Sequence, residues 1–386
     1  RGAIVITLSV IFLLLTTFVT LYSTSAILLE QKMVNSQTRS IFAFEAAEFG
    51  LSTAVQYISD GIDRNDDGNI DAIFSVDTDN VATTNSSAVG NQSVTVAITD
   101  IDGDPNMLSA FRIVSQGFSD DSSATRTITQ IIKIVDALPN VPDNPLTTRG
   151  TVDVNGSATV HNPEGNSTIW SGGDVDLGSN NAAATYVADP SGAGYPSCMD
   201  TPMTCSTAKT SNKVTVGLDI IEHDSNLNNL GPEEMFENFF GMSPEAYREA
   251  IVTIDLAAGS DFSAGAALAQ NEVVWYDGDV AINGVTVGCS TAVNGNNFCP
   301  QANEDPSIVI INGNATMSGG PHFYGIVFVL GDISLSGNST FNGALVVAGD
   351  TNNSSGSLDV YYNSRLLENV RDNAGFSSSS GTWKDF

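Results

Sequence analysis

The sequence predicts an α+β protein in which a long N-terminal α-helix packs on a small antiparallel sheet, followed by a mainly-β domain of Gly/Asn-rich repeats. Three observations predict this. Residues 3–58 contain no proline, three runs between 93 and 135 alternate apolar and polar residues, and a glycine-bounded phrase recurs after residue 150. The 386 residues are enough for two or three domains. The expected boundaries are 1–59 for the helix, 60–137 for the sheet, 138–149 for a linker and 150–386 for the repeats, with inserts at 182–212 and 231–251.

Charge and cysteine usage exclude some classes of protein. The chain has 44 Asp and Glu against 14 Lys and Arg, a formal net charge of −30, so it would repel nucleic acid. Its 41% hydrophobic content argues against global disorder. The cysteines form two close pairs without histidine partners, Cys198/Cys205 and Cys289/Cys299, which predicts disulfides in a secreted or cell-surface protein. Four cysteines permit three pairings, so the connectivity stays open.

The first element is expected to be one continuous helix. No charged residue lies between Gly2 and Leu29, a stretch longer than the ~20 residues that span a bilayer, and Arg1 supplies a positive charge for the cytoplasmic side. Beyond Glu30 the apolar residues step by three or four, as one face of an amphipathic helix would. We expect this face to cover the sheet. Its members are Met33, Ile41, Phe44, Ala47, Leu51, Val55 and Ile58.

A family resemblance rests on the same helix. Residues 39–58 contain Ala-Phe-Glu-Ala-Ala-Glu-Phe-Gly-Leu, and the chain opens with Arg-Gly-Ala-Ile-Val. Both segments resemble the PilX-type minor pilins of type IV pili, in about the first 60 residues. The resemblance implies a subunit held in the inner membrane before assembly and then in an extracellular surface filament, with other pilin subunits as partners through the helix. The residues expected in the filament core are Ile4, Ile11, Leu13, Leu14, Phe18, Leu21, Phe44 and Glu48.

One departure from the family pattern bears on the kind of subunit. Most major pilins carry Glu at the fifth mature position, whereas this chain has Val5, or Thr7 if the count begins after Gly2. Some minor pilins resemble this chain in that respect. The departure therefore favours a minor subunit, and a major subunit that builds a filament alone is the alternative.

The segment after the helix contains an acidic loop. Its hydrophilic side chains follow the spacing of an EF-hand-like loop, although Phe74 stands where the bidentate Glu would be. The loop therefore predicts either a Ca²⁺ site or a solvated acidic turn. The candidate ligands are Asp63, Asn65, Asp67, Asn69 and Asp71. The alternating runs 93–99, 110–117 and 126–135 then predict antiparallel strands, and three prolines between 139 and 145 predict the linker.

The repeats begin with glycine, continue through Asp, Asn or Ser, and end at a second glycine six positions later. Full copies start at Gly278, Gly313, Gly331 and Gly337. Short strands between Gly/Asn corners predict a parallel β-helix, with a β-sandwich as the alternative. The apolar segments 325–330 and 343–348 are expected to line its core.

No catalytic motif appears in the sequence. His161, His223 and His322 are expected as isolated surface or turn residues, and residues 150–350 hold only three Lys or Arg, too few to bind a polyanionic sugar as β-helix lyases do. We therefore expect a non-enzymatic subunit whose acidic domain contacts a tip adhesin or a glycan. The alternative from another class is a membrane-tethered β-helix adhesin or carbohydrate-active protein.

Overall fold

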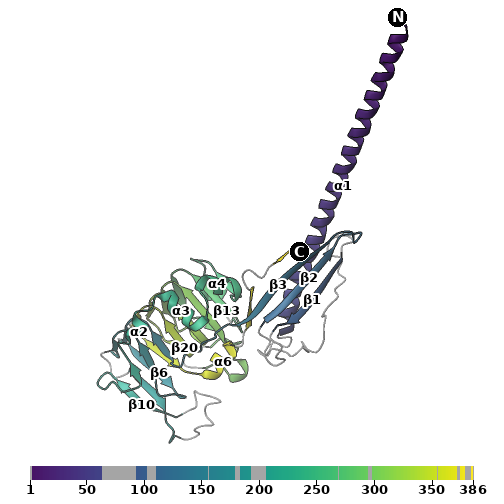
Figure 1. Ribbon diagram of the computed structural model, residues 1–386. Helices are drawn as coiled ribbons and strands as arrows, with labels where there is room; N and C mark the ends of the chain where they lie inside the picture. The colour runs from purple at the N-terminus through teal and green to yellow at the C-terminus, as the bar shows by residue number, and fades with distance from the viewer. Residues whose placement is uncertain are drawn as a thin grey trace. The chain divides into compact units, whose positions relative to one another are not determined.

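The computed structural model has a long N-terminal helix and a mostly-β remainder, and it divides into two compact units (Figure 1). The first unit comprises residues 1–134 and 377–386, and the second comprises residues 135–376. The described residues are 2–62, 93–101, 110–154, 156–178, 183–192, 206–267, 269–293, 298–353, 355–371, 374–378 and 384–385.

The first unit is a helix on an antiparallel sheet. The helix α1 runs over Gly2–Ile62, and the strands are β1 (Ser93–Asp100), β2 (Ala110–Phe118) and β3 (Thr125–Asp136). The sheet order is β1-β2-β3-β23, where β23 is Ala374–Ser378, and β24 (Lys384–Asp385) also pairs with β3. The end of the chain thus returns to a sheet whose other strands end at residue 136.

Small residues of α1 form its contact with the sheet. The buried positions are Ala43, Ala46, Ala47, Gly50 and Ala54, which recur with helical spacing. The expected face of large apolar residues is therefore wrong in part, because Ile41 is 56% and Met33 is 62% exposed.

Gly50, Gly117 and Ser115 show why the residues of α1 that face β2 are small. A Cβ on Gly117 of β2 would lie 2.1 Å from the Ala43 carbonyl oxygen, and one on Gly50 would lie 2.3 Å from Ser115 Oγ. The backbones of α1 and β2 are thus too close for larger side chains. The Ser115 hydroxyl uses this approach to donate a 2.7 Å hydrogen bond to the Ala47 carbonyl.

The second unit is built from short strands that almost all pair in parallel. Its smaller sheet has the order β14-β17-β19-β21-β5-β8, and its larger sheet includes the path β9-β6-β22-β20-β18-β16-β13-β12. The antiparallel exception among the described pairs of this unit's named strands is β10 with β9. The strands of the larger sheet are β4 (Leu146–Thr148), β6 (Ser157–Asn162), β7 (Ile169–Ser171), β9 (Ala184–Ala188), β10 (Thr207–Asn212), β11 (Ile220–Ile221), β12 (Ile254–Leu256), β13 (Val273–Asp277), β15 (Thr286–Val287), β16 (Ser307–Asn312), β18 (His322–Val329), β20 (Ser339–Val347) and β22 (Ser357–Tyr361). Those of the smaller sheet are β5 (Val152–Val154), β8 (Val175–Asp176), β14 (Val280–Asn283), β17 (Ala315–Ser318), β19 (Ile333–Leu335) and β21 (Thr351–Asn353).

The glycine-bounded phrases mark where the chain passes between sheets. Three phrases enclose β14, β17 and β19, which stack in parallel, whereas the phrase from Gly337 encloses the first part of β20 in the other sheet. Within β20, Gly343 has φ +124°, and a Cβ there would lie 2.0 Å from the Gly325 carbonyl oxygen of β18. Only glycine suits this position within the strand, because both the backbone angle and the neighbouring strand exclude a side chain.

Side chains also join successive turns of the chain. The backbone N–H of Asp332 donates to Asn314 Oδ1, and that of Asp350 donates to Asp332 Oδ1, each at 2.8 Å and 18 residues apart. The Asn and Asp residues that follow the corner glycines therefore form a ladder along the smaller sheet, which accounts for the Gly-Asp and Gly-Asn starts of the phrases.

The strands do not stack in sequence order. The strands β4, β5 and β6 pair with β20, β21 and β22, so residues about 200 positions apart meet, as in the hydrogen bond from Thr151 Oγ1 to Asp350 Oδ1. Residues 138–149, expected as a linker, contain β4 and the buried Leu138. The 182–212 insert likewise contains β9 and β10, which extend the sheet.

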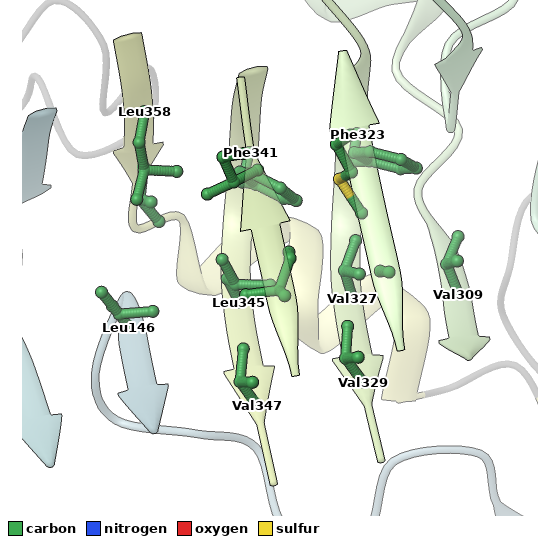
Figure 2. Packing of buried hydrophobic residues seen from close by; sticks show 14 of the residues in the cluster. Leu146, Val309, Phe323, Val327, Val329, Phe341, Leu345, Val347 and Leu358 are labelled. Atoms are coloured by element: carbon green, nitrogen blue, oxygen red, sulfur yellow. The ribbon is translucent and has the colours of Figure 1, made fainter. Parts of the chain in front are cut away.

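The apolar strands of the larger sheet are buried on both faces. Val327 and Val329 of β18 and Leu345 and Val347 of β20 point into the core between the sheets (Figure 2). Ile326 and Phe328 belong instead to a second cluster on the outer face, which helices cover. The segments 325–330 and 343–348 therefore do not line the inner core alone, because every second side chain contacts this outer layer.

Helices supply that outer layer. The helices that contribute side chains to it are α2 (Ser225–Asn228), α3 (Pro232–Phe240), α4 (Pro244–Ala250) and α6 (Ser364–Arg371). The helix α5 (Phe262–Gly265) instead places Phe262 in the core between the sheets, and the short η3 (Gln301–Asn303) has no buried residue. Phe236 and Phe240 of α3 lie 5.2 and 5.5 Å from the Phe328 ring, and Tyr247 of α4 donates a 2.7 Å hydrogen bond to the Ala137 carbonyl. On the outer face of the larger sheet, the chain's own helices therefore cover the apolar side chains.

Candidate functional site

The candidate functional site is the N-terminal part of α1, because its apolar side chains have no cover from the described chain. By length and composition the helix could cross a membrane, and none of its most apolar window is buried. Every large apolar residue from 6 to 34 is at least half exposed. They are Ile6, Leu8, Val10, Ile11, Phe12, Leu13, Leu14, Leu15, Phe18, Val19, Leu21, Tyr22, Ile27, Leu28, Leu29, Met33 and Val34.

Most of the described Ser and Thr hydroxyl groups in this segment are satisfied by the helix itself. Thr16, Thr20 and Thr24 donate to carbonyl oxygens four residues earlier at 2.8–3.0 Å, and Ser25 does the same at 2.9 Å. A hydroxyl bonded in this way needs no water, so it can enter an apolar environment at low cost. This property was not among the predictions from the sequence, although the i, i+4 spacing of Thr16, Thr20 and Thr24 signals it.

The residues expected in the filament core lie on α1 but differ in exposure. Ile11, Leu13, Leu14, Phe18 and Leu21 belong to the exposed set above. Ile4 lies in the helix. Phe44 is half-buried and Glu48 is exposed, both in the part of α1 that carries the small-residue contact with the sheet.

Polar contacts fix α1 to the sheet next to that contact. Arg39 forms a 2.8 Å ion pair with Asp121 in the turn between β2 and β3, and Arg126 of β3 donates to Ser40 Oγ at 2.9 Å. Hydrogen bonds from the hydroxyl and backbone N–H of Ser123, with a further contribution from Arg39, lower the pKa of Asp121 to about 2. A folded sheet is thus joined directly to the exposed apolar segment by one uninterrupted helix.

The predicted calcium ligands and the first cysteine pair lie outside the described residues. Asp63, Asn65, Asp67, Asn69 and Asp71 are among residues 63–92, so the Ca²⁺ site stays a prediction. Cys198 and Cys205 are among residues 193–205, so their pairing also stays a prediction.

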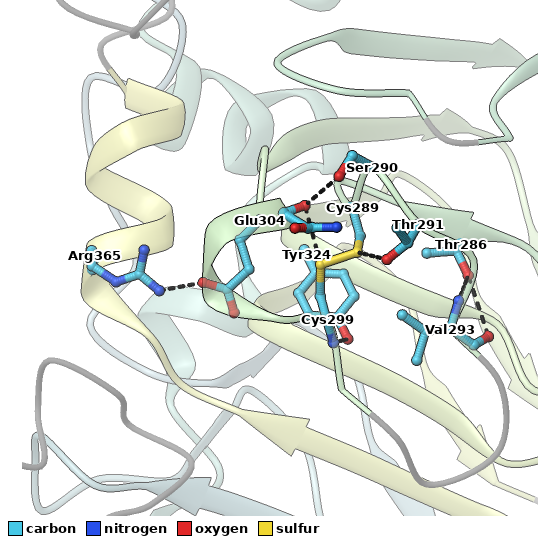
Figure 3. Close-up of a disulfide and its surroundings, with 10 residues drawn as sticks. Thr286, Cys289, Ser290, Thr291, Val293, Cys299, Glu304, Tyr324 and Arg365 are labelled. Atoms are coloured by element: carbon cyan, nitrogen blue, oxygen red, sulfur yellow. Dashed lines mark hydrogen bonds and ion pairs between the residues drawn. A yellow bond between two sulfur atoms is a disulfide. The ribbon is translucent and has the colours of Figure 1, made fainter.

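The second cysteine pair closes a loop on the larger sheet. Cys289 and Cys299 form a disulfide with their Cα atoms 6.0 Å apart, and the Cys299 backbone N–H donates to the Tyr324 hydroxyl at 2.7 Å (Figure 3). Beside them Arg365 of α6 pairs with Glu304. The disulfide therefore closes the 289–299 loop, and the hydrogen bond to Tyr324 ties that loop to β18. Both have a structural role.

The histidines do not form a common site. His161 lies in β6, stacked between Tyr186 and Tyr361 at 4.3 and 4.6 Å, and His322 is buried at the start of β18. The expectation that both lie in turns is wrong, because both belong to strands. His223 is exposed and lies 3.1 Å from Asp174. Across the described ranges no three His, Cys, Asp or Glu side chains are grouped to hold a metal ion.

Comparisons with known proteins add little to these observations. No protein-family model and no curated protein matches the chain. Among solved structures, the competence-associated pilin ComZ from Thermus thermophilus is similar over 90% of this chain and 98% of its own, at 11% identity and a TM-score of 0.25. That score is too low to support an argument about fold or function.

Proposed function

We propose that this chain is a structural, non-enzymatic subunit of a type IV pilus or pilus-like surface filament. The observation that carries the proposal is the exposed apolar segment of α1 between residues 6 and 34, in which the hydroxyls of Thr16, Thr20 and Thr24 donate to carbonyls of the same helix. An apolar surface of this length is stable only in lipid or against other apolar helices. In a filament, copies of the same helix take the place of the lipid.

The junction with the head supports a filament subunit over a simple tether. Ala43, Ala47 and Gly50 hold α1 tightly on β2, so a force on the apolar segment is passed to a folded head without a flexible linker. The resemblance of residues 39–58 to PilX-type minor pilins points the same way. The inner membrane before assembly, and the outer surface afterwards, are the corresponding locations.

We further propose that the second unit is a parallel β-helix that faces outward in the filament. Its support is the parallel pairing along both sheets, the 18-residue recurrence of the Asn/Asp ladder and the stacked corner glycines. An acidic, outward domain would keep the filament soluble and leave a surface for a tip protein or a glycan.

The test introduces one charge into the apolar segment. Leu13→Asp should abolish recovery of the chain in sheared filaments, because a carboxylate is costly in either lipid or a helix bundle. Asn35→Asp adds the same charge to the polar side of the transition at residues 30–39 and should leave recovery unchanged. Normal filaments that contain the Leu13→Asp chain would refute the proposal, as would a wild-type chain that stays in the membrane and never enters a polymer.

A further inference from the structure

The outer face of the larger sheet changes in character from its helix-covered strands to β6 and β22. Under the helices its outward side chains are apolar and buried, as for Ile326 and Phe328. In β6 and β22 the inward side chains are still apolar and buried, as for Val160 and Val360, but the outward ones are polar or aromatic and partly exposed. This part of the face is therefore accessible to an outside partner. Its outward residues are Ser157, Thr159, His161, Ser357, Asp359 and Tyr361.

Three rings stand side by side on this face and are called here the aromatic row. Tyr361 of β22 pairs with His161 of β6, and His161 pairs with Tyr186 of β9, so each of three neighbouring strands supplies one ring. The His161 ring centroid lies 4.6 Å from that of Tyr361 and 4.3 Å from that of Tyr186, at interplanar angles of 14° and 3°. All three residues are partly exposed. Because paired strands fix the spacing of the rings, the aromatic row is a preformed surface that needs little ordering when it binds.

Hydrogen-bonding groups run beside the aromatic row. Asp359 and Thr159 lie two residues before Tyr361 and His161 and pair with each other across β22 and β6. The Thr159 hydroxyl donates to Asp359 Oδ1, and the Ser357 hydroxyl donates to Asp359 Oδ2 at 3.1 Å. The carboxylate is thus held in one orientation, and each of its oxygens keeps a lone pair that can accept a hydrogen bond from a ligand.

A buried amide without partners lies at one end of the aromatic row. Asn342 of β20 pairs with Tyr361 and lies on the same outer face, because the preceding residue, Phe341, belongs to the inner core. Asn342 is 1% exposed, and among the described residues neither its Nδ2 nor its Oδ1 has a hydrogen-bond partner. Leaving a buried donor and acceptor unpaired is costly. A ligand that both donates and accepts hydrogen bonds at the Tyr361 end would satisfy this amide.

The charges on this face exclude several classes of ligand. Asp359 and Lys209, which lies opposite Tyr186 on β10, are the charged residues that strand pairing places in these two rows. Their charges are opposite, and the whole chain carries −30, so nucleic acids and acidic polysaccharides are not attracted. Burial lowers the pKa of His161 to about 4, so its ring is neutral at neutral pH. An uncharged ligand that is rich in hydroxyl groups fits these rows best.

We propose that the aromatic row binds an extended, uncharged polysaccharide, such as a β-linked glucan or mannan, that lies across β22, β6 and β9. Sugar rings offer C–H groups that pack on aromatic side chains and hydroxyls that hydrogen-bond to Tyr, His, Thr and Asp. The row is straight, so it suits a chain that is itself straight, whereas an α-linked glucan coils. The inference rests on the outward role proposed for the second unit and names the ligand class and the residues that hold it.

The experiment uses the full chain in a zwitterionic detergent without a sugar headgroup. Isothermal titration with cellohexaose and with mannohexaose should show binding of at least one, and saturation-transfer NMR should place its ring protons against the protein. Maltohexaose and oligogalacturonate should not bind. Combined Tyr186→Ala and Tyr361→Ala should lower the affinity by about tenfold or more, the loss typical of truncating aromatic side chains at the centre of a binding surface.

Milder variants separate binding from folding. Combined Tyr186→Phe and Tyr361→Phe keeps the stacked rings and removes two hydroxyls, so it should weaken binding by a smaller factor at unchanged thermal unfolding. Asn342→Leu replaces the unpaired amide at similar volume and should weaken binding without loss of stability, since no unpaired polar group is left behind. Asp359→Asn should also weaken binding, whereas Glu249→Gln, which removes an exposed charge on α4, should not.

Three results would overturn the proposal: no binding of either extended hexasaccharide, equal binding of maltohexaose, or wild-type affinity in the double alanine variant. The assay needs no filament. A chain that binds the hexasaccharides but never enters a polymer would therefore refute the filament proposal alone, and a chain that enters filaments but binds no hexasaccharide would refute this inference alone.

Discussion

Two apolar regions of this protein differ in burial, although their compositions are similar: the strands β18 and β20 are buried, and the N-terminal part of α1 is exposed. In β18 and β20 every described side chain is buried, because the inner face packs between the sheets and the outer face packs under α3 and α4. In α1 the residues from 6 to 34 are exposed all round. The difference teaches that the covering partner decides the role of an apolar run, and for α1 the described chain supplies none.

The largest expected effect comes from one truncation made in each run. Phe328→Ala removes a ring that contacts Phe236 and Phe240, and it should destabilise the second unit by about 3–5 kcal/mol. Leu13→Ala should leave the free energy of unfolding unchanged, because no described residue packs on that side chain. Chemical denaturation of both variants in the same detergent makes the measurement. Equal losses would break the comparison.

A smaller effect tests the part of α1 that does have a partner. Gly117→Ala places a methyl group 2.1 Å from the Ala43 carbonyl, so α1 and β2 must separate. We expect a loss of about 1–3 kcal/mol in the first unit, as for other overpacked sites. Gln116→Ala, one residue earlier and on the opposite face of β2, is the control. Unchanged stability in Gly117→Ala would show that the contact between helix and sheet is looser than described.

A pH-dependent effect tests the burial of His161 between two tyrosine rings of the second unit. Burial between Tyr186 and Tyr361 lowers the pKa of His161 to about 4, from an ordinary value near 6.5. The ring is therefore neutral when folded, so stability is complete above pH 6.5 and falls by about 2 kcal/mol as the pH decreases towards 4. His161→Phe should remove that slope between pH 6.5 and 4. A wild type with flat stability over this range would contradict the stacked arrangement.

The smallest effect concerns the exposed ion pair next to the α1 contact. Because its pKa is lowered to about 2, Asp121 contributes stability above pH 4 that is lost as the pH falls from about 4 to 2. Asp121→Asn should remove this acid-range slope and cause only a small loss of stability at pH 7, measured by thermal unfolding at each pH, and Asp120→Asn serves as the control. A large loss at pH 7 would mean that the helix depends on this pair more than on its small-residue contact.

The sequence predicted elements better than it predicted their partners. Helical periodicity, alternation and recurring glycines located α1, the three head strands and the repeats, because each is a local pattern. It failed where the answer depends on distant residues. Ala43, Ala46 and Ala47 lie in the contact face because Gly117, in another element, leaves room for them. The strand β4 lies next to prolines and was not predicted, because its partner β20 is about 200 residues away. The same holds for the site. Exposure of residues 6–34 followed from composition, whereas the ion pair between Arg39 and Asp121 joins two distant elements and has no local signature in the sequence.

The out-of-order stacking of the second unit has a consequence for biosynthesis. Repeat proteins whose units stack in sequence order can add each unit to a folded neighbour as it emerges from the ribosome. Here Val152 and Ser157 pair with Thr351 and Ser357, so the early strands keep one edge open until translation is nearly complete. Unpaired edges invite wrong pairing between nascent chains, and closing so distant a contact is slow. We therefore expect C-terminal truncations before residue 357 to yield aggregates rather than shorter folded domains, and export of the chain to depend on holding factors that protect this edge.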